Sequence, residues 1–200
     1  MAFPCLTIFM IFIIWLSFRL SKVKHNMADK EEAFWNKELK ANSTPKKDID
    51  NLNYITIPLE KFPSDFTTDS EVLDIVDKLN TLSSERILNI TGITNTDIKL
   101  SYGVGNFDKV SKYGDNFDTL TVLINQYAKK ALEHNREDIA LPVLEFAIGI
   151  KTDISESYTL LANLYKQNEK KEKLEYLIEQ VNTSNLLLKQ SILNQINTNL

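Results

Sequence analysis

The first twenty residues constrain this chain most, because they read as a single apolar helix. From Phe3 to Phe18 the sequence runs for sixteen residues without a charge, and Arg19, Lys22 and Lys24 follow at once. With Leu20 as its last residue, an eighteen-residue helix at ~1.5 Å per residue measures about 27 Å, close to the roughly 30 Å of a hydrocarbon core. The pattern predicts a transmembrane anchor in the lipid bilayer at residues 3–20.

A cleaved signal peptide is the competing interpretation, which needs a positive n-region and a small-residue cleavage site. Only Met1 and Ala2 precede the apolar run, and no A-x-A pattern follows it. Since the basic residues all lie after the anchor, the positive-inside rule predicts a single-pass cell-membrane protein with an N-out, C-in topology. We therefore expect the C-terminal domain in the cytoplasm, which agrees with a lone cysteine that can form no internal disulfide.

Composition limits the rest of the chain to one modest domain. Hydrophobic residues make up 43% of the sequence, enough for one core, and the formal net charge is -4. There is no basic stripe with interleaved aromatic residues, so nucleic acid is not an expected partner.

Two segments connect the anchor to the helical C-terminal part. Residues 21–63 are expected to form a juxtamembrane helix and then an extended tether, because Pro45, Pro58 and Pro63 interrupt the helical pattern. Residues 64–116 are expected to hold one helix, at about 69–83 behind a capping box at residues 68–71, followed by an irregular segment. Gly103-Val-Gly105 lacks the third glycine of a G-x-G-x-x-G phosphate loop.

Residues 117–200 show an internal repeat. A shift of 34 residues aligns apolar residues with apolar residues, pairing Ile124 with Tyr158, Tyr127 with Leu161, Ala128 with Ala162, Leu144 with Ile178 and Ala147 with Val181. Ala128, Ala140 and Ala147 are separated by 12 and 7 residues, as are the small residues of a tetratricopeptide repeat. The chain thus resembles that family over roughly residues 121–188, which implies antiparallel helical hairpins.

The match departs from the family at three places. Asn135 and Glu169 stand where the turn glycine belongs, and of the two only Asn readily tolerates the left-handed conformation. Pro142 should kink its helix unless that helix begins near Asp138. An ordinary helical bundle with chance spacing remains the alternative, and residues 186–196 would cap either arrangement. As a whole, the chain also resembles uncharacterised bacterial single-pass membrane proteins with a small tetratricopeptide-like domain.

The resemblance implies peptide binding on the first helix of each unit. Four residues of that face, Asn125, Lys129, Asn163 and Lys166, resemble the Asn/Lys sets with which some tetratricopeptide domains hold a peptide carboxylate. They form the candidate peptide groove.

No catalytic, cofactor-binding or metal-ligating set is recognisable in the sequence, which has only two histidines and one cysteine. The sequence therefore predicts a mainly α, membrane-anchored interaction module, an adaptor or scaffold for an unidentified protein or peptide, and no enzyme. Two alternatives stay open: an enzyme whose site lies around residues 84–116, and a structural subunit of a membrane complex.

Overall fold

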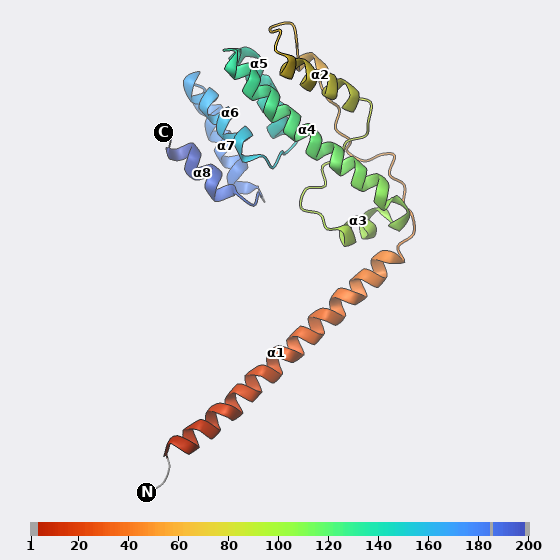
Figure 1. Cartoon of the computed structure of the whole chain (residues 1–200), viewed down its shortest axis with the longest axis vertical. Helices are drawn as coiled ribbons and strands as arrows, with labels where there is room; N and C mark the ends of the chain where they lie inside the picture. Colours follow the sequence, from red (N-terminus) through yellow and green to blue (C-terminus); the bar gives the residue numbers. More distant parts are fainter. Residues whose placement is uncertain (1–3, 185, 199–200) are drawn as a thin grey trace. The chain divides into compact units, whose positions relative to one another are not determined.

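The computed structural model is helical, and the residues that it describes, 4–184 and 186–198, contain no strand (Figure 1). Side chains are described for all of these except residues 4–6, 25, 26, 28 and 198. In chain order the elements are α1 (Pro4–Asn42), the 3-10 helix η1 (Leu59–Lys61), α2 (Ser70–Leu82), α3 (Asn95–Tyr102), the 3-10 helix η2 (Val104–Asn106), α4 (Phe107–Glu133), α5 (Glu137–Gly149), α6 (Ser155–Gln167), α7 (Lys171–Thr183) and α8 (Lys189–Thr198).

The chain divides into two compact units. Unit 1 comprises Met1–Asp48 and Thr94–Phe107, and unit 2 comprises Ile49–Ile93 and Asp108–Leu200. Unit 1 therefore contains α1, α3 and η2, while unit 2 contains η1, α2 and the helices from α4 onward. The predicted boundaries at residues 20, 63 and 116 follow the local pattern of the sequence, whereas these units join segments that lie far apart in the chain.

The predicted transmembrane anchor at residues 3–20 is wrong, since the described residues contain no helix that is both long and apolar enough to cross a bilayer. The uncharged part of α1 runs from its first residue, Pro4, to Phe18, and Arg19 follows. These fifteen residues at ~1.5 Å each measure about 22 Å, short of a core of roughly 30 Å. The single-pass, N-out and C-in topology depended on that span and is wrong with it. Phe3 lies outside the described residues.

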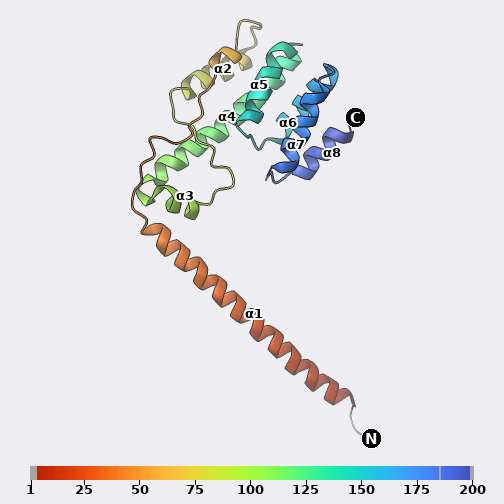
Figure 2. The ribbon, with the colours of Figure 1, turned by 180° about the vertical axis from the view of Figure 1, so that it is seen from behind.

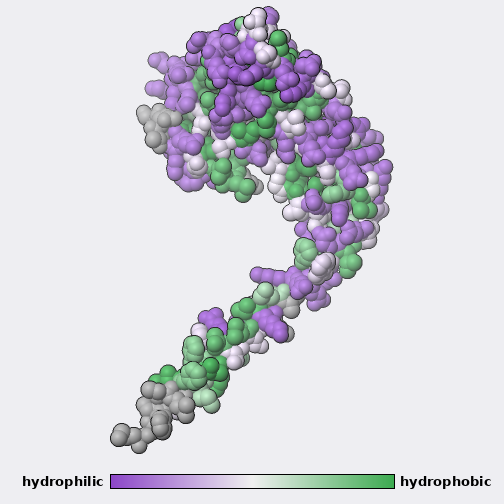
Figure 3. All heavy atoms as spheres, in the orientation of Figure 1, coloured by the Kyte–Doolittle hydropathy of each residue, from purple (hydrophilic) through white to green (hydrophobic). Residues whose placement is uncertain are grey.

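α1 continues without a break through the predicted juxtamembrane helix to Asn42. Large apolar side chains are exposed along its first half, as Figure 3 shows, and they include Ile8, Phe9, Ile11, Ile14, Phe18 and Leu20. At its other end α1 packs on α3. Lys37 pairs with Asp97 at 2.7 Å, and Lys99 Nζ donates to Asn42 Oδ1 at 2.8 Å.

The Gly103-Val-Gly105 segment serves backbone packing in unit 1. Gly103 ends α3 with φ 86°, and a Cβ placed there would lie 2.2 Å from the carbonyl oxygen of Pro45. Nearby, Asn106 is fully buried and its Nδ2 donates to the carbonyls of Lys47 at 2.7 Å and Tyr102 at 2.8 Å. A glycine is required at position 103 by both its positive φ and this close approach.

α2 confirms the helix expected from the sequence, at residues 70–82 rather than 69–83. Asp69 caps it by accepting a 2.9 Å hydrogen bond from the backbone N–H of Glu71, so the cap lies one residue after Thr68. The apolar face of α2 is buried through Val72, Ile75, Leu79 and Leu82.

Three helices of unit 2 end in the same kind of turn. Asn135, Lys151 and Glu169 have φ values of 57°, 61° and 53°, after α4, α5 and α6 respectively. In each case the following N–H bonds the carbonyl five residues back: Arg136 to Ala131, Thr152 to Ala147, and Lys170 to Tyr165, at 2.8 to 3.1 Å. This is the Schellman motif, which usually uses glycine. Glu169 adopts the left-handed conformation despite its side chain, contrary to the sequence-based expectation.

The helices from α4 onward are connected by short turns, and those from α5 onward pack on one another. α5 packs on α6, α6 on α7 and α8, and α7 on α8; both Figure 1 and Figure 2 show α6, α7 and α8 side by side. The chain is thus all-helical and rich in helical hairpins, as predicted. The four alanines of the repeat, Ala128, Ala140, Ala147 and Ala162, are completely buried. α5 begins at Glu137 and runs through Pro142, which removes one backbone hydrogen bond from the helix.

The irregular segment 84–93 of unit 2 lies against α4. Its backbone forms hydrogen bonds with two other segments: the Ile55 N–H donates to the carbonyl of Ile87 at 2.9 Å, and the Leu88 N–H donates to the carbonyl of Tyr113 at 3.1 Å. Ile87 and Leu88 are buried. Gly114 on α4 makes room for Ile90, since a Cβ there would lie 2.3 Å from Ile90 Cδ1. The segment 84–93, with its buried Ile87 and Leu88, is therefore a packed strap without helix or strand structure at residues 86–90.

Candidate functional site

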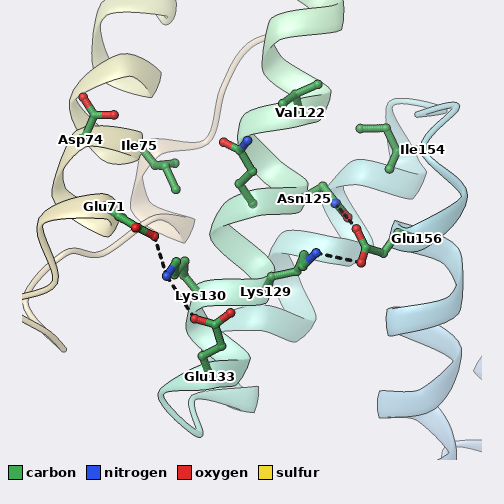
Figure 4. A pocket seen from close by; sticks show the side chains of 11 residues that line it. Glu71, Asp74, Ile75, Val122, Asn125, Lys129, Lys130, Glu133, Ile154 and Glu156 are labelled. Carbon is green, nitrogen blue, oxygen red and sulfur yellow. Dashed lines mark hydrogen bonds and ion pairs between the residues drawn. The ribbon is translucent and has the colours of Figure 1, made fainter.

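An open groove of about 580 Å³ lies between α2 and α4 in unit 2 (Figure 4). The start of α6 closes one side of it. The lining residues are Glu71, Asp74 and Ile75 of α2, Val122, Asn125, Gln126, Lys129, Lys130 and Glu133 of α4, and Ile154 and Glu156 at the beginning of α6. Two of the four residues predicted for a peptide groove, Asn125 and Lys129, belong to this lining.

Asn125 and Lys129 both bind the carboxylate of Glu156. Asn125 Nδ2 donates to Glu156 Oε2 at 2.7 Å, and Lys129 Nζ lies 2.9 Å from Glu156 Oε1. Asn125 is buried, and its Oδ1 accepts a 3.0 Å hydrogen bond from the fully buried Ser157 hydroxyl. Hydrogen bonds from Asn125 and Lys129 lower the pKa of Glu156 below its ordinary value. The chain's own carboxylate thus occupies the Asn/Lys pair.

Lys130 joins α2 to α4 at the other end of the groove. Its Nζ lies 2.5 Å from Glu71 and 3.1 Å from Glu133, and 3.7 Å from the capping residue Asp69. Hydrogen bonds to Glu71 and Glu133 raise the pKa of Lys130 above its ordinary value. The ammonium group is therefore fixed as the centre of a small ionic network.

The other two predicted groove residues lie on α6, away from this lining. Lys166 donates to the backbone carbonyl of Ile196, so it anchors the last turn of α8 on α6. Partial burial lowers the pKa of Lys166. Asn163, one turn earlier, is half-buried and also has an interaction partner. The structure therefore brings together Asn125 and Lys129 but not the full set of four.

The groove carries an excess of negative charge. Its lining holds four carboxylates, Glu71, Asp74, Glu133 and Glu156, against the two ammonium groups of Lys129 and Lys130. The side chains of Glu71, Asp74 and Glu133 are 67%, 60% and 59% exposed. They therefore remain accessible to a ligand although they form ion pairs.

Further carboxylates continue the acidic surface beyond Val122. Asp118 lies one turn before Val122 on α4, and Asp153 directly precedes Ile154. Partial burial raises the pKa of Asp118, and the like charges of Asp153 and Asp115 add to this effect. In the part of the chain that the structure describes, these three aspartates form no ion pair with a cation.

The apolar part of the groove is small and aliphatic. Ile75 is buried, Ile154 is half-buried and Val122 is 46% exposed. Figure 4 shows these three side chains near one end of the groove; at the other end the Lys130 network lies on the α2 side, and Asn125, Lys129 and Glu156 lie on the α6 side.

Sequence reasoning missed α2 and the start of α6 as walls of the groove. Glu71 and Asp74 precede Lys130 by more than fifty residues, and Glu156 follows Asn125 by thirty-one. A helical-face projection of α4 cannot identify partners on other helices. A charge pattern was available, because the only two lysines in the second half of α4 face acidic first turns of two other helices.

The segment 84–116 divides between the two units. Its residues 84–93 form the packed strap of unit 2, and Thr94–Phe107 belong to unit 1. Asp97 in unit 1 accepts from Lys37 and from the hydroxyl of Thr94, and these bonds lower its pKa. Among the described residues, no three His, Cys, Asp or Glu side chains are grouped as a metal ion would require.

Comparison of the chain with protein-family models, with curated proteins and with solved structures gave no match. The fold and the groove are therefore the basis for assigning a function.

Proposed function

We propose that this chain is a protein-interaction module that binds a peptide segment of a partner in the groove between α2 and α4. The observation that carries the proposal is the open groove itself. It combines a partly exposed aliphatic patch with accessible charged side chains. The bound segment would lie along α4, which is the first helix of the first predicted repeat.

The proposal extends to the architecture around the groove, which we assign as two tetratricopeptide-like hairpins, α4 with α5 and α6 with α7. Equivalent Schellman turns at Asn135 and Glu169 are 34 residues apart, and the aligned Ala128 and Ala162 are both buried. Such repeats bind ligands on the face formed by the first helix of each unit. Because the same turn also ends α5 at Lys151, the assignment rests on the buried alanines at the 34-residue offset together with the turns.

A binding role, and not a catalytic one, fits the chemistry of the lining. Each lysine of the groove is held by carboxylates at 2.5 to 3.1 Å, so neither is a poised base or nucleophile. Recruitment of a partner is the role that we assign to the domain.

Photo-crosslinking in native cells tests the proposal. A benzoylphenylalanine at position 122 should crosslink a partner protein, while the same residue at position 73 should not. Val122 and Leu73 form a matched pair, because both are 46% exposed and Leu73 lies on α2 outside the groove. Equal crosslinking from both positions, or none from position 122, would argue against a partner in this groove.

A further inference from the structure

The chemistry of the groove also indicates which kind of peptide it accepts, an inference that rests on the proposed function. A peptide carboxylate is the ligand suggested by the Asn/Lys resemblance. That site is already filled, because Asn125 and Lys129 hold Glu156 at 2.7 and 2.9 Å. An incoming carboxylate would have to displace Glu156 and leave it beside the groove as a second negative charge.

A cationic ligand, by contrast, would find carboxylates that it can reach without displacing Glu156. The exposed oxygens of Glu71 and Glu133 at one end share a single ammonium group, that of Lys130. At the other end the 60% exposed Asp74 pairs at 2.6 Å with Lys78 of its own helix, which is itself 58% exposed. Asp118 and Asp153, which form no ion pair among the described residues, lie just beyond Val122 and Ile154. Lysine or arginine side chains could pair with carboxylates at both ends without breaking the Asn125–Glu156 contact.

The length of the groove limits the peptide. From Val122 to Glu133 along α4, eleven residues at ~1.5 Å each measure roughly 16 Å. An extended chain at ~3.3 Å per residue covers this distance with about five residues. The aliphatic patch of Ile75, Val122 and Ile154 accepts one branched side chain between the two acidic ends.

We propose that the groove binds a short extended peptide with basic residues at both ends and a branched aliphatic residue between them.

The test uses the full-length protein, kept in solution with a mild non-ionic detergent because α1 exposes large apolar side chains. The probes are fluorescent heptapeptides, acetylated and amidated at their ends, with a central isoleucine and two flanking positions occupied by Lys, Gln or Glu. Fluorescence polarisation at 50 and 300 mM NaCl gives their dissociation constants. The Lys peptide should bind at least tenfold more tightly than the Glu peptide, with a difference that shrinks at the higher salt concentration.

Charge-neutral variants provide the matched control. The double variant Asp74→Asn and Glu133→Gln should weaken binding of the Lys peptide severalfold and reduce the difference in affinity between the Lys and Glu peptides. Glu60→Gln with Glu175→Gln removes the same charge from exposed positions outside the groove and should leave the affinity unchanged.

Two results would overturn the proposal. Equal or tighter binding of the Glu peptide refutes the charge preference, and undiminished Lys-peptide binding by Val122→Arg shows that the peptide binds elsewhere. Absence of measurable binding for every probe also counts against this ligand class. A crosslinked partner at position 122 would still support the groove itself in each case, which separates the two proposals.

Discussion

Gly114 and Ile90 give a sharp test of the packing in unit 2. A Cβ at position 114 would lie 2.3 Å from Ile90 Cδ1 and 2.6 Å from Cγ1, about 1 Å inside the ordinary carbon–carbon contact of roughly 3.5 Å. Gly114→Ala should gain about 0.5 to 1 kcal/mol from helix propensity. Overpacking of this size costs about 2 to 3 kcal/mol, so the variant should lose about 1 to 2.5 kcal/mol in total.

Removing Ile90 should reverse the sign of this effect. In an Ile90→Ala background the new methyl group has space, so Gly114→Ala should stabilise the protein by about 0.5 to 1 kcal/mol. Urea unfolding of the four proteins, followed by circular dichroism, measures the coupling. If Gly114→Ala is equally destabilising in both backgrounds, the strap at residues 84–93 does not pack on α4 as described.

Three further predictions concern the repeat core and the groove. Ala128→Leu or Ala162→Leu should cost ~1 to 3 kcal/mol of unfolding free energy, because each overpacks a buried site. The control Ala33→Leu, on the exposed surface of α1, should change stability by less than about 0.5 kcal/mol, and unchanged unfolding of both core variants would refute the 34-residue register. Asn125→Ala should cost ~1 to 3 kcal/mol because it leaves the buried Ser157 hydroxyl without its acceptor, while the exposed Asn80→Ala serves as its control in the same urea titration. Because the pKa of Glu156 is lowered, its contacts stabilise the fold at pH values above the ordinary glutamate pKa and lose this effect as the pH falls. The difference in melting temperature between wild type and Glu156→Gln should therefore shrink from pH 7 to pH 3. A constant difference would show that the carboxylate charge is not involved.

Local signals in the sequence were sufficient where the structure depends on neighbouring residues. The helix at residues 70–82 was predicted from a capping box at residues 68–71 and from apolar residues at helical spacing, although its cap is Asp69 and not Thr68. The buried alanines follow from the 34-residue offset. The segment 84–116 was unreadable because its hydrogen bonds depend on distant residues. Ile87 and Leu88 pair with Ile55 and Tyr113, which no local pattern can reveal.

In the candidate site, too, the sequence could identify residues on one helix but not their partners on other helices. Asn125 and Lys129 could be chosen from one face of α4, but their partner Glu156 could not, since it comes from another helix. The repeat pattern predicted that Lys166 lies in the same groove as Asn125 and Lys129. In the structure Lys166 donates instead to the carbonyl of Ile196 in α8. The anchor prediction treated residues 3–20 as one uniform apolar span, but no described helix is both long and apolar enough to cross a bilayer, and Arg19 ends the uncharged part of α1.

Methyl NMR of the full-length protein tests most directly whether this groove binds peptides. With isoleucine and valine methyl groups labelled, the Lys-flanked heptapeptide is titrated to saturation. The methyl signals of Ile75, Val122 and Ile154 should shift together with a single dissociation constant, while those of Val110 and Ile139, which are buried outside the groove, should not move. Shifts confined to other residues, or none at all in the three groove residues, would contradict peptide binding between α2 and α4.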